Sequence, residues 1–234
     1  MAPFILINGL FIGIFTATEA GGVAVIYTIF LGLIYRELTL EKLIKCLKDT
    51  RKIRGAVCEF GAAQGETSAL IASEIFSSNK ILHLFDSFQG LPKPSKKDVL
   101  KDDIFNLGSI EAYKGQMSVP KEMVTTRMRE VGFPQNRYII HKGFIKKPAL
   151  SGKNLPQNVS FAYVDLDFYE PIKLTLDFLD KVTGKGSVIV VDEYDFFSTG
   201  SKLAIDEFIA EKKKKYKIFI PNKSFGYFAI ITKK

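Results

Sequence analysis

Acidic residues follow two neighbouring apolar stretches of the chain, and they are the residues best suited to chemistry. Asp165 comes directly after residues 159–164, and Asp192 and Glu193 come directly after residues 187–191. Because the carboxyl ends of parallel strands meet at one edge of a sheet, where α/β proteins bind their ligands, we expect these carboxylates to converge. Unpaired anions repel one another, and a hard divalent cation such as Mg²⁺ is the simplest reason for such a cluster. The sequence therefore predicts a metal site made by Asp165, Asp192 and Glu193.

The elements that must position these acids are a strand, a helix and a second strand. Residues 171–182 have helical periodicity and connect the two apolar stretches. A crossover of this kind is right-handed and makes its two strands parallel. Near the end of the chain, residues 216–221 and 225–232 are joined by a short polar turn and predict a hairpin. The pattern predicts an α/β fold with a mostly parallel sheet and an antiparallel C-terminal hairpin strand.

A glycine turn follows another predicted strand of this sheet, residues 55–60. Glu59 lies near the end of the strand, and Gly61 and Gly65 flank a short turn that opens a predicted helix at residues 66–76. Glycine permits a tight turn and a close approach of the backbone to a ligand. The spacing lacks the denser glycines of the dinucleotide fingerprint. A carboxylate with this sparser turn suits the ammonium and sulfonium groups of S-adenosylmethionine better than it suits a pyrophosphate.

Asp86 and Ser87 follow the next predicted strand, residues 80–85, about 25 residues after the glycine turn begins. An acidic residue at this position can accept hydrogen bonds from both hydroxyls of a ribose. We therefore expect the cofactor to be bound by Glu59, Gly61, Gly65, Asp86 and Ser87.

A histidine, His141, ends a further predicted strand at residues 137–141. An imidazole at the carboxyl end of a strand is a candidate general base, and an imidazole satisfied by a neighbouring carboxylate is the alternative. Asp165 is the other candidate for accepting a proton. Residues 88–117 form a long polar connection that could cover a substrate as a lid.

The first segment of the chain differs in composition from the rest. Residues 3–35 are almost wholly apolar and exceed the roughly 20 residues needed to cross a bilayer. Basic residues follow it, so the positive-inside rule would place the remainder in the cytoplasm. We expect an apolar helical segment at residues 1–48 and a catalytic domain at residues 49–234. The apolar segment would allow a membrane tether or association into a homo-oligomer.

The composition excludes some classes of function. The chain has 234 residues and a net charge of +8, but its lysines are dispersed. The interleaving of aromatic and basic residues that is typical of RNA-binding sheets does not occur, so we expect no nucleic-acid partner. Cys46 and Cys58 are the two cysteines, and they form no paired metal motif.

Five blocks of sequence occur in an order that is hard to obtain by chance: EFGAAQG at 59–65, DSFQGLP at 86–92, YVDLDFYEP at 163–171, VDEY at 191–194 and GSKLAIDEF at 200–208. Together they resemble the macrocin and mycinamicin type of sugar O-methyltransferase, over about residues 55–208. The resemblance implies a Rossmann-like fold of the class I methyltransferases with S-adenosylmethionine as methyl donor. It also implies a divalent cation, usually magnesium, and a deoxysugar hydroxyl as the acceptor.

Carried over by position, Asp165 and Asp192 match the metal-binding acids of this family. Glu193 stands where the family usually has a second aspartate, and its longer side chain changes the reach of that oxygen ligand. The glycine block and Asp86 match the cofactor-binding positions. The resemblance thus implies an enzyme that methylates a hydroxyl of a sugar or similar diol, with a cation orienting two neighbouring hydroxyls.

Residues 2–45 separately resemble a fragment of the large permease subunit of tripartite ATP-independent periplasmic transporters, through the stretch GIFTATEAGGVAVIY at 13–27. One such fragment lacks the neighbouring helices that a translocation path requires. It is either a membrane tether, a fusion to an unrelated enzyme, or a helical hairpin that covers the enzyme core. Two alternatives for the catalytic part stay open: an NAD-dependent oxidoreductase, and a non-catalytic fusion product with a methyltransferase-like fold.

Overall fold

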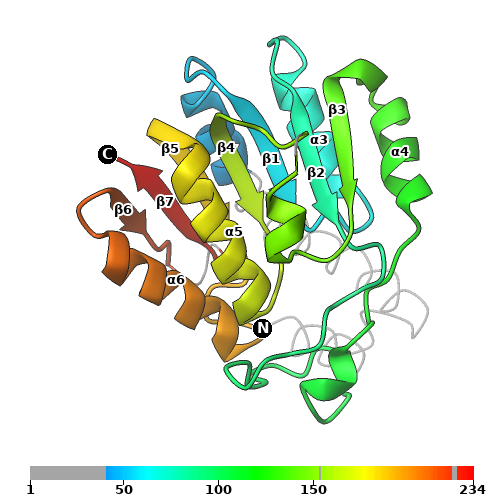
Figure 1. Ribbon diagram of the computed structural model, residues 1–234. Coiled ribbons are helices and arrows are strands. Elements are labelled where there is room, and N and C mark those ends of the chain that lie inside the picture. Colours follow the sequence, from blue (N-terminus) through cyan, green and yellow to red (C-terminus); the bar gives the residue numbers. More distant parts are fainter. Residues whose placement is uncertain (1–40, 153, 223–225) are drawn as a thin grey trace, which may run out of the picture. The chain divides into compact units, whose positions relative to one another are not determined.

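A computed structural model describes residues 41–152, 154–222 and 226–234 of the protein (Figure 1). The chain divides into two compact units, and the larger one comprises residues 43–223 and 227–234. The apolar segment expected at residues 3–35, with its membrane tether, lies outside the described residues. Within the part of the chain that the structure describes, no helix is long and apolar enough to span a membrane.

A sheet of seven strands in the order β3-β2-β1-β4-β5-β7-β6 forms the centre of the larger unit. Its first five members in this order pair in parallel, whereas β7 is antiparallel to both of its neighbours. This arrangement confirms the expected mostly parallel sheet with an antiparallel C-terminal hairpin strand. The strands are β1 (Ala56–Phe60), β2 (Leu82–Asp86), β3 (Tyr138–Lys142), β4 (Val159–Val164), β5 (Thr183–Val191), β6 (Tyr216–Phe219) and β7 (Ala229–Lys233).

Helices cover both faces of this sheet (Figure 1). The described α-helices with defined bounds are α3 (Glu66–Ile75), α4 (Lys121–Glu130), α5 (Tyr169–Val182) and α6 (Thr199–Lys212). Three short 3-10 helices lie in the connections: η1 (Glu111–Tyr113), η2 (Gln135–Arg137) and η3 (Lys147–Leu150). Helices α5 and α6 share one core cluster, while α3, α4 and residues 43–47 share the other.

The central strand β4 is apolar at five of its six positions because it is buried on both faces. All six of its residues are buried. Ala162 and Val164 pack with α5 and α6, whereas Phe161 and Tyr163 belong to the cluster on the opposite face. A parallel strand covered by helices on both faces has no solvent side, so polar residues do not alternate along it, and its polar residue Ser160 is itself buried. Burial becomes partial at Asp165, which begins the loop.

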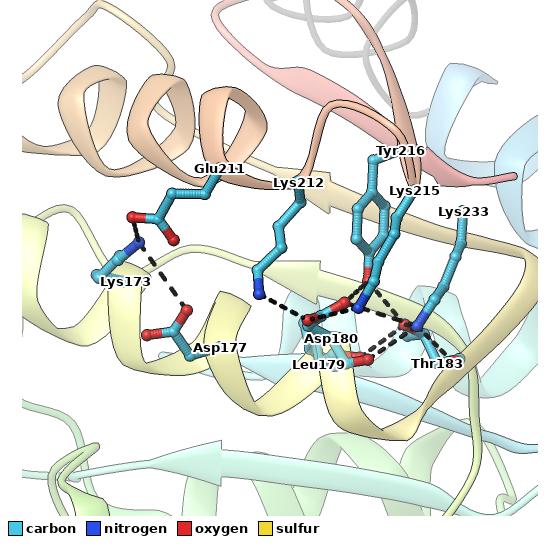
Figure 2. A network of polar contacts seen from close by, with 10 residues as sticks. All are labelled: Lys173, Asp177, Leu179, Asp180, Thr183, Glu211, Lys212, Lys215, Tyr216 and Lys233. Carbon is cyan, nitrogen blue, oxygen red and sulfur yellow. Dashed lines mark hydrogen bonds and ion pairs between the residues drawn. The ribbon is translucent and has the colours of Figure 1, made fainter.

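A network of charges ties the ends of α5 and α6 to the last two strands (Figure 2). Its centre is Asp180 on α5, which accepts a hydrogen bond of 3.0 Å from the hydroxyl of Tyr216. Lys212, Lys215 and Lys233 approach the same carboxylate at 3.2, 3.6 and 3.7 Å. The network therefore joins α6, β6 and β7 to α5 at the end of the sheet opposite to the carboxyl ends of β4 and β5.

The loop that follows β2 is fastened to the start of α5 by a buried carboxylate and to the start of α6 by a backbone hydrogen bond. Asp98 accepts hydrogen bonds of 2.7 Å from the backbone N–H of Tyr169 and from both the backbone N–H and the hydroxyl of Ser95. Next to it, Thr199 donates its backbone N–H to the carbonyl of Val99 at 3.0 Å. These bonds hold residues 95–99 beside the carboxyl ends of the parallel strands.

Candidate active site

Backbone hydrogen bonds continue past the ends of the parallel strands and fix the first residue of each loop. Gly61 donates its N–H to the carbonyl of Phe85 in β2. Asp165 donates to the carbonyl of Phe60 at the end of β1, and Asp192 donates to that of Val164 at the end of β4. Each of these bonds is 2.8 Å long. The loops after β1, β4 and β5 therefore start side by side. The convergence of these loops at one edge, which the sequence predicts, is present in the structure.

Gly61 and Gly65 serve different purposes in the turn after β1. Gly61 has a φ of +91°, and a Cβ atom there would lie 1.8 Å from the carbonyl oxygen of Asp165. Gly65 has a φ of +81°, and its Cβ atom would lie 3.0 Å from the Cα of Val124 on α4. The first glycine thus lets the β1 and β4 loops touch, and the second lets α3 pack against α4.

Asp86 organises the turn after β1 from the neighbouring strand. One of its carboxylate oxygens accepts the backbone N–H of Ala63 at 2.9 Å, and the other accepts that of Phe88 at 2.6 Å. A carboxylate has about four lone-pair sites, so capacity remains on both oxygens for the hydroxyls of a ribose. Asp86 therefore has the position and the chemistry expected of a ribose-binding acid.

A pocket with a volume of about 1160 Å³ lies over this edge of the sheet. Five of the residues expected to bind cofactor, metal or proton line it: Gly61, Asp86, Ser87, Asp165 and Glu193. The others do not appear in its lining: Glu59, Gly65, His141 and Asp192. The pocket thus joins the expected cofactor positions to part of the expected acidic cluster.

Glu59 lies beneath the glycine turn and is fully buried. One of its oxygens accepts a short hydrogen bond from the hydroxyl of Ser68 on α3, and the other has no hydrogen-bond partner. Burial raises the pKa of Glu59 to about 8, against the lowering effect of the Ser68 bond. Its place below the turn makes Glu59 a support for the loop that carries Gly61, without direct access to the pocket.

His141 lies away from the acidic cluster. Its Nε2 is 2.9 Å from Nδ1 of His83 on the neighbouring strand, and its ring stacks on Phe85 with centroids 4.2 Å apart. Strand β3 is at the edge of the sheet, three strand spacings or roughly 14 Å from β4. Burial lowers the pKa of His141. The structure therefore pairs His141 with His83 and does not bring it to Asp165.

Four carboxyl groups at the ends of β4 and β5 influence one another strongly. Burial, followed by the charges of Asp192 and Asp167, raises the pKa of Asp165 well above its usual range. Burial and the charge of Asp192 raise the pKa of Asp167 to about 7. Burial, Asp192 and Asp167 together raise the pKa of Glu193 to about 8. The cluster is thus a site of concentrated, poorly compensated negative charge.

The fit of this cluster to a divalent cation is mixed. All of its donors are oxygens, as Mg²⁺ prefers, and the buried Oε2 of Glu193 has no hydrogen-bond partner. However, Asp192 already accepts bonds from the hydroxyl of Tyr163 and from the backbone N–H of Glu193. Across the described ranges, no three His, Cys, Asp or Glu side chains are arranged to hold a metal ion. The chemistry of the donors fits the cation, whereas the arrangement of their side chains does not form a complete ligand set.

Two residues of this edge receive a different role than the sequence suggests. Asp167, two residues after the proposed metal ligand Asp165, lines the pocket directly. Tyr163, within β4, holds the carboxylate of Asp192 through its hydroxyl. The sequence does not predict this role for Tyr163, because Tyr163 lies within a run of buried strand residues and is buried like its neighbours.

Solved O-methyltransferases share this fold. The O-methyltransferase NovP superposes with a TM-score of 0.69 at 19% identity, covering 84% of this chain and 79% of NovP. The calicheamicin methyltransferase CalS11 superposes with a TM-score of 0.62 at 20% identity, covering 83% of this chain and 77% of CalS11. The architecture is therefore that of a Rossmann-like methyltransferase.

The sequence profile described as Macrocin-O-methyltransferase (TylF) matches residues 35–226, so the chain belongs to the macrocin O-methyltransferase family. This family membership confirms the resemblance carried by the five sequence blocks and the enzyme class expected from it. It favours O-methyl transfer over the oxidoreductase alternative.

A short part of the chain also resembles two curated proteins. The large permease protein SiaM of the sialic acid TRAP transporter from Vibrio cholerae is 47% identical over 51 residues, which are 21% of this chain and 12% of the permease. The protein YgiK of Salmonella typhimurium is 39% identical over 71 residues, 28% of this chain and 16% of YgiK. The chain therefore spans only a small part of the length of these curated relatives.

Proposed function

We propose that the protein transfers the methyl group of S-adenosylmethionine to a hydroxyl of a sugar or similar small-molecule diol. The observation that carries this proposal is one pocket lined by Gly61, Asp86 and Ser87 on one side and by Asp165 and Glu193 on the other. The first group has the chemistry of a nucleoside site, and the second has that of a site for proton transfer. Membership of the macrocin O-methyltransferase family supports the same reaction.

On the cofactor side, we assign the ribose hydroxyls to the free lone pairs of Asp86. The turn from Gly61 to Ala63 approaches Asp86 closely, since the N–H of Ala63 already binds that carboxylate. The small side chains of this turn leave room for the methionine moiety. Glu59 and Gly65 act indirectly in this proposal, because one supports the turn and the other lets α3 pack against α4.

On the acceptor side, Asp165 is the proposed general base. As the acceptor oxygen attacks, a C–O bond forms and the C–S bond of the sulfonium breaks. The electron pair of that bond stays on sulfur, giving S-adenosylhomocysteine, and the hydroxyl proton passes to Asp165. Asp165 lines the pocket together with Asp167 and Glu193, where its carboxylate can accept that proton. The remaining task is to position the methyl group in line with the oxygen, within roughly 3–3.5 Å.

We further propose that Asp165, Asp192 and Glu193 hold a divalent cation such as Mg²⁺ when the enzyme is loaded. The concentration of negative charge and the unpartnered Oε2 of Glu193 support this assignment. Asp192 does not line the pocket, so its carboxylate would have to turn towards the ion. When bound, such an ion supplies Lewis acidity to the acceptor oxygens and charge for the carboxylates to share.

The test is a methyl-transfer assay on wild type and Asp165→Asn with a panel of sugar acceptors, scored by the mass that one transferred methyl group adds. We expect Asp165→Asn to lower turnover by roughly a hundredfold or more while S-adenosylmethionine still binds by calorimetry. Asp206→Asn, on the exposed side of α6, is the matched control and should keep full activity. Wild-type turnover should fall in excess chelator and return with Mg²⁺. Full activity of Asp165→Asn would show that Asp165 is not the general base. Full activity in excess chelator would show that the reaction needs no cation.

A further inference from the structure

The pocket is larger than one ligand requires. Its volume is about 1160 Å³, whereas sites for single drug-sized ligands usually measure roughly 300–1,000 Å³. Only the part near Gly61, Asp86 and Ser87 has the features of a nucleoside site. The remaining volume is therefore available to the acceptor. The chemistry of the residues that line it indicates what kind of acceptor can bind.

The charges that line this pocket are separated into two groups. Four of the acids lie at or just after the carboxyl ends of β2, β4 and β5, and the fifth, Glu170, lies in the first turn of α5. The lysines lie in the connections that follow β2 and β3. We call them the lysine rim, which consists of Lys93, Lys96, Lys114, Lys146 and Lys147.

The ion pairs of the described residues distinguish the lysine rim from other lysines of the same loop. Among the described residues, none of these five forms an ion pair with a carboxylate. Two other lysines of the same β2 loop differ in this respect, because Lys97 binds Glu207 at 2.9 Å and Lys101 binds Asp195. Lys97 and Lys101 do not line the pocket. In the part of the chain that the structure describes, carboxylates therefore pair with the two lysines outside the pocket lining and with none of the five lysines in it.

Backbone contacts fix the segments of the lysine rim relative to one another. Leu91 donates its N–H to the carbonyl of Gln116, and Gly115 donates to the carbonyl of Leu91, both at 2.9 Å. A Cβ atom on Gly90 would lie 2.2 Å from that same carbonyl oxygen of Gln116. The segment after β3 joins them, since Gly143 donates its N–H to the carbonyl of Asp86 at 2.8 Å. These contacts therefore hold lysines that are distant in sequence around the same pocket.

We propose that the lysine rim binds a phosphate or diphosphate group carried by the sugar acceptor. This inference rests on the proposed function and adds the substrate class to it. A phosphoryl group presents several anionic oxygens, which lysines on separate loops can approach together as point charges. The lysines attract the phosphate end of the acceptor, which leaves its sugar hydroxyls for Asp165 in the same pocket. The separation of charge thereby selects both the acceptor and its orientation.

The direct test measures binding of inorganic pyrophosphate to the full chain, by calorimetry in excess S-adenosylhomocysteine. We expect Lys93→Glu/Lys96→Glu to weaken this binding by roughly tenfold at low ionic strength, since each exposed charge contact contributes about a fivefold factor at most. The control is Lys213→Glu/Lys214→Glu, which changes the net charge equally at exposed positions beyond α6. Equal weakening by both pairs, or by neither, would overturn the lysine rim as a binding site.

Turnover assays then distinguish the source of the phosphate. One 6-deoxyhexose is offered free, as its 1-phosphate and as a nucleoside diphosphate sugar. We expect a phosphorylated form to have at least a tenfold higher kcat/KM than the free sugar, and Lys93→Glu/Lys96→Glu to reduce that preference. Equal kcat/KM for free and phosphorylated sugar would refute the inference while leaving methyl transfer intact. Failure of the proposed function is a different result, in which no sugar is methylated and S-adenosylmethionine does not bind.

Discussion

Because Gly61 has no side chain, the loop after β1 can touch the loop after β4. Gly61 has a left-handed φ of +91°, and only 1.8 Å separates the place where a Cβ atom would lie from the carbonyl oxygen of Asp165. Any other residue would have to displace the backbone that carries the proposed base. The glycine is therefore required twice, by its own conformation and by its neighbour.

We expect Gly61→Ala to lower the free energy of unfolding by more than about 3 kcal/mol, because strain at a positive φ adds to a backbone clash. Gly132→Ala is the matched control, since Gly132 has a φ of +67° and open space around its Cβ position. That control should cost only about 1 kcal/mol. Urea unfolding of both variants measures the difference. Equal losses would show that the contact with Asp165 has no energetic consequence.

Sequence position predicts the site residues that directly follow strands and misses those that act from elsewhere. Asp86 and Asp165 are recognisable because an acidic residue ends an apolar run. Tyr163 is not, because its hydroxyl reaches Asp192 from within such a run. His141 also satisfies the strand-end rule, yet its strand is at the sheet's edge. The rule locates an edge of the sheet, and the order of the strands decides which ends become neighbours.

The junction of α5, α6 and the last two strands depends on one carboxylate. Burial acts to raise the pKa of Asp180, but hydrogen bonds from Tyr216 and Lys212 and the charges of Lys212 and Lys215 outweigh it, so the pKa is lowered overall. A carboxyl group with a lowered folded-state pKa stabilises the fold above its unfolded pKa of about 3.9. That stabilisation is lost as the pH falls through the folded-state pKa.

We expect Asp180→Asn to reduce the free energy of unfolding by about 2 kcal/mol at pH 7, as loss of hydrogen bonds to a charged group usually does. The difference from wild type should shrink as the pH falls below about 4. Asp177→Asn on the same helix is the control, because its side chain is 45% exposed and lies 3.9 Å from Lys173 (Figure 2). It should change stability by less than about 0.5 kcal/mol. A pH-independent loss for Asp180→Asn would contradict the electrostatic explanation.

The elements themselves are largely predictable, since buried parallel strands are continuous apolar runs. Val159–Val164 is a strand with the bounds that its sequence indicates, and α5 starts two residues earlier than expected, at Tyr169. The start of β5 is harder to predict. Gly184 and Gly186 suggest the end of a helix, but both lie within the strand Thr183–Val191. Both glycines lie between the paired residues Thr183 and Val188, where the register with β4 shifts, and glycine is common at such irregularities of a strand.

The sequence places the boundary of the catalytic unit after residue 48, but residues before that point pack into the core of the unit. Leu43, Cys46 and Leu47 are buried in the core cluster that contains Ile71 and Ile75 of α3. Amphipathic residues in a basic stretch give no sign of this packing, because the positive charges suggest the flank of a membrane segment. We therefore propose that the unit that folds as a methyltransferase begins before Leu43.

A chain that lacks residues 1–48 should consequently be less stable than one that lacks residues 1–34. Each buried apolar side chain that is removed costs about 2 kcal/mol or more, so the shorter chain should have a clearly lower Tm. Thermal unfolding of the two truncated chains, with S-adenosylmethionine binding as a check on folding, makes the comparison. Identical Tm values would place the boundary after residue 48.

The position of β7 between β5 and β6 has a consequence for the order of assembly during synthesis. β6 pairs with β7 alone among the described strands, and β7 covers the edge of β5 that β4 leaves open. A ribosome releases residues 229–233 after the other six described strands, so a nascent chain carries an uncovered β5 edge and an unattached β6 until that moment. Unpaired edges invite pairing with other chains. Loss of residues 229–233 would therefore take β7 from the sheet, detach β6 and expose the edge of β5.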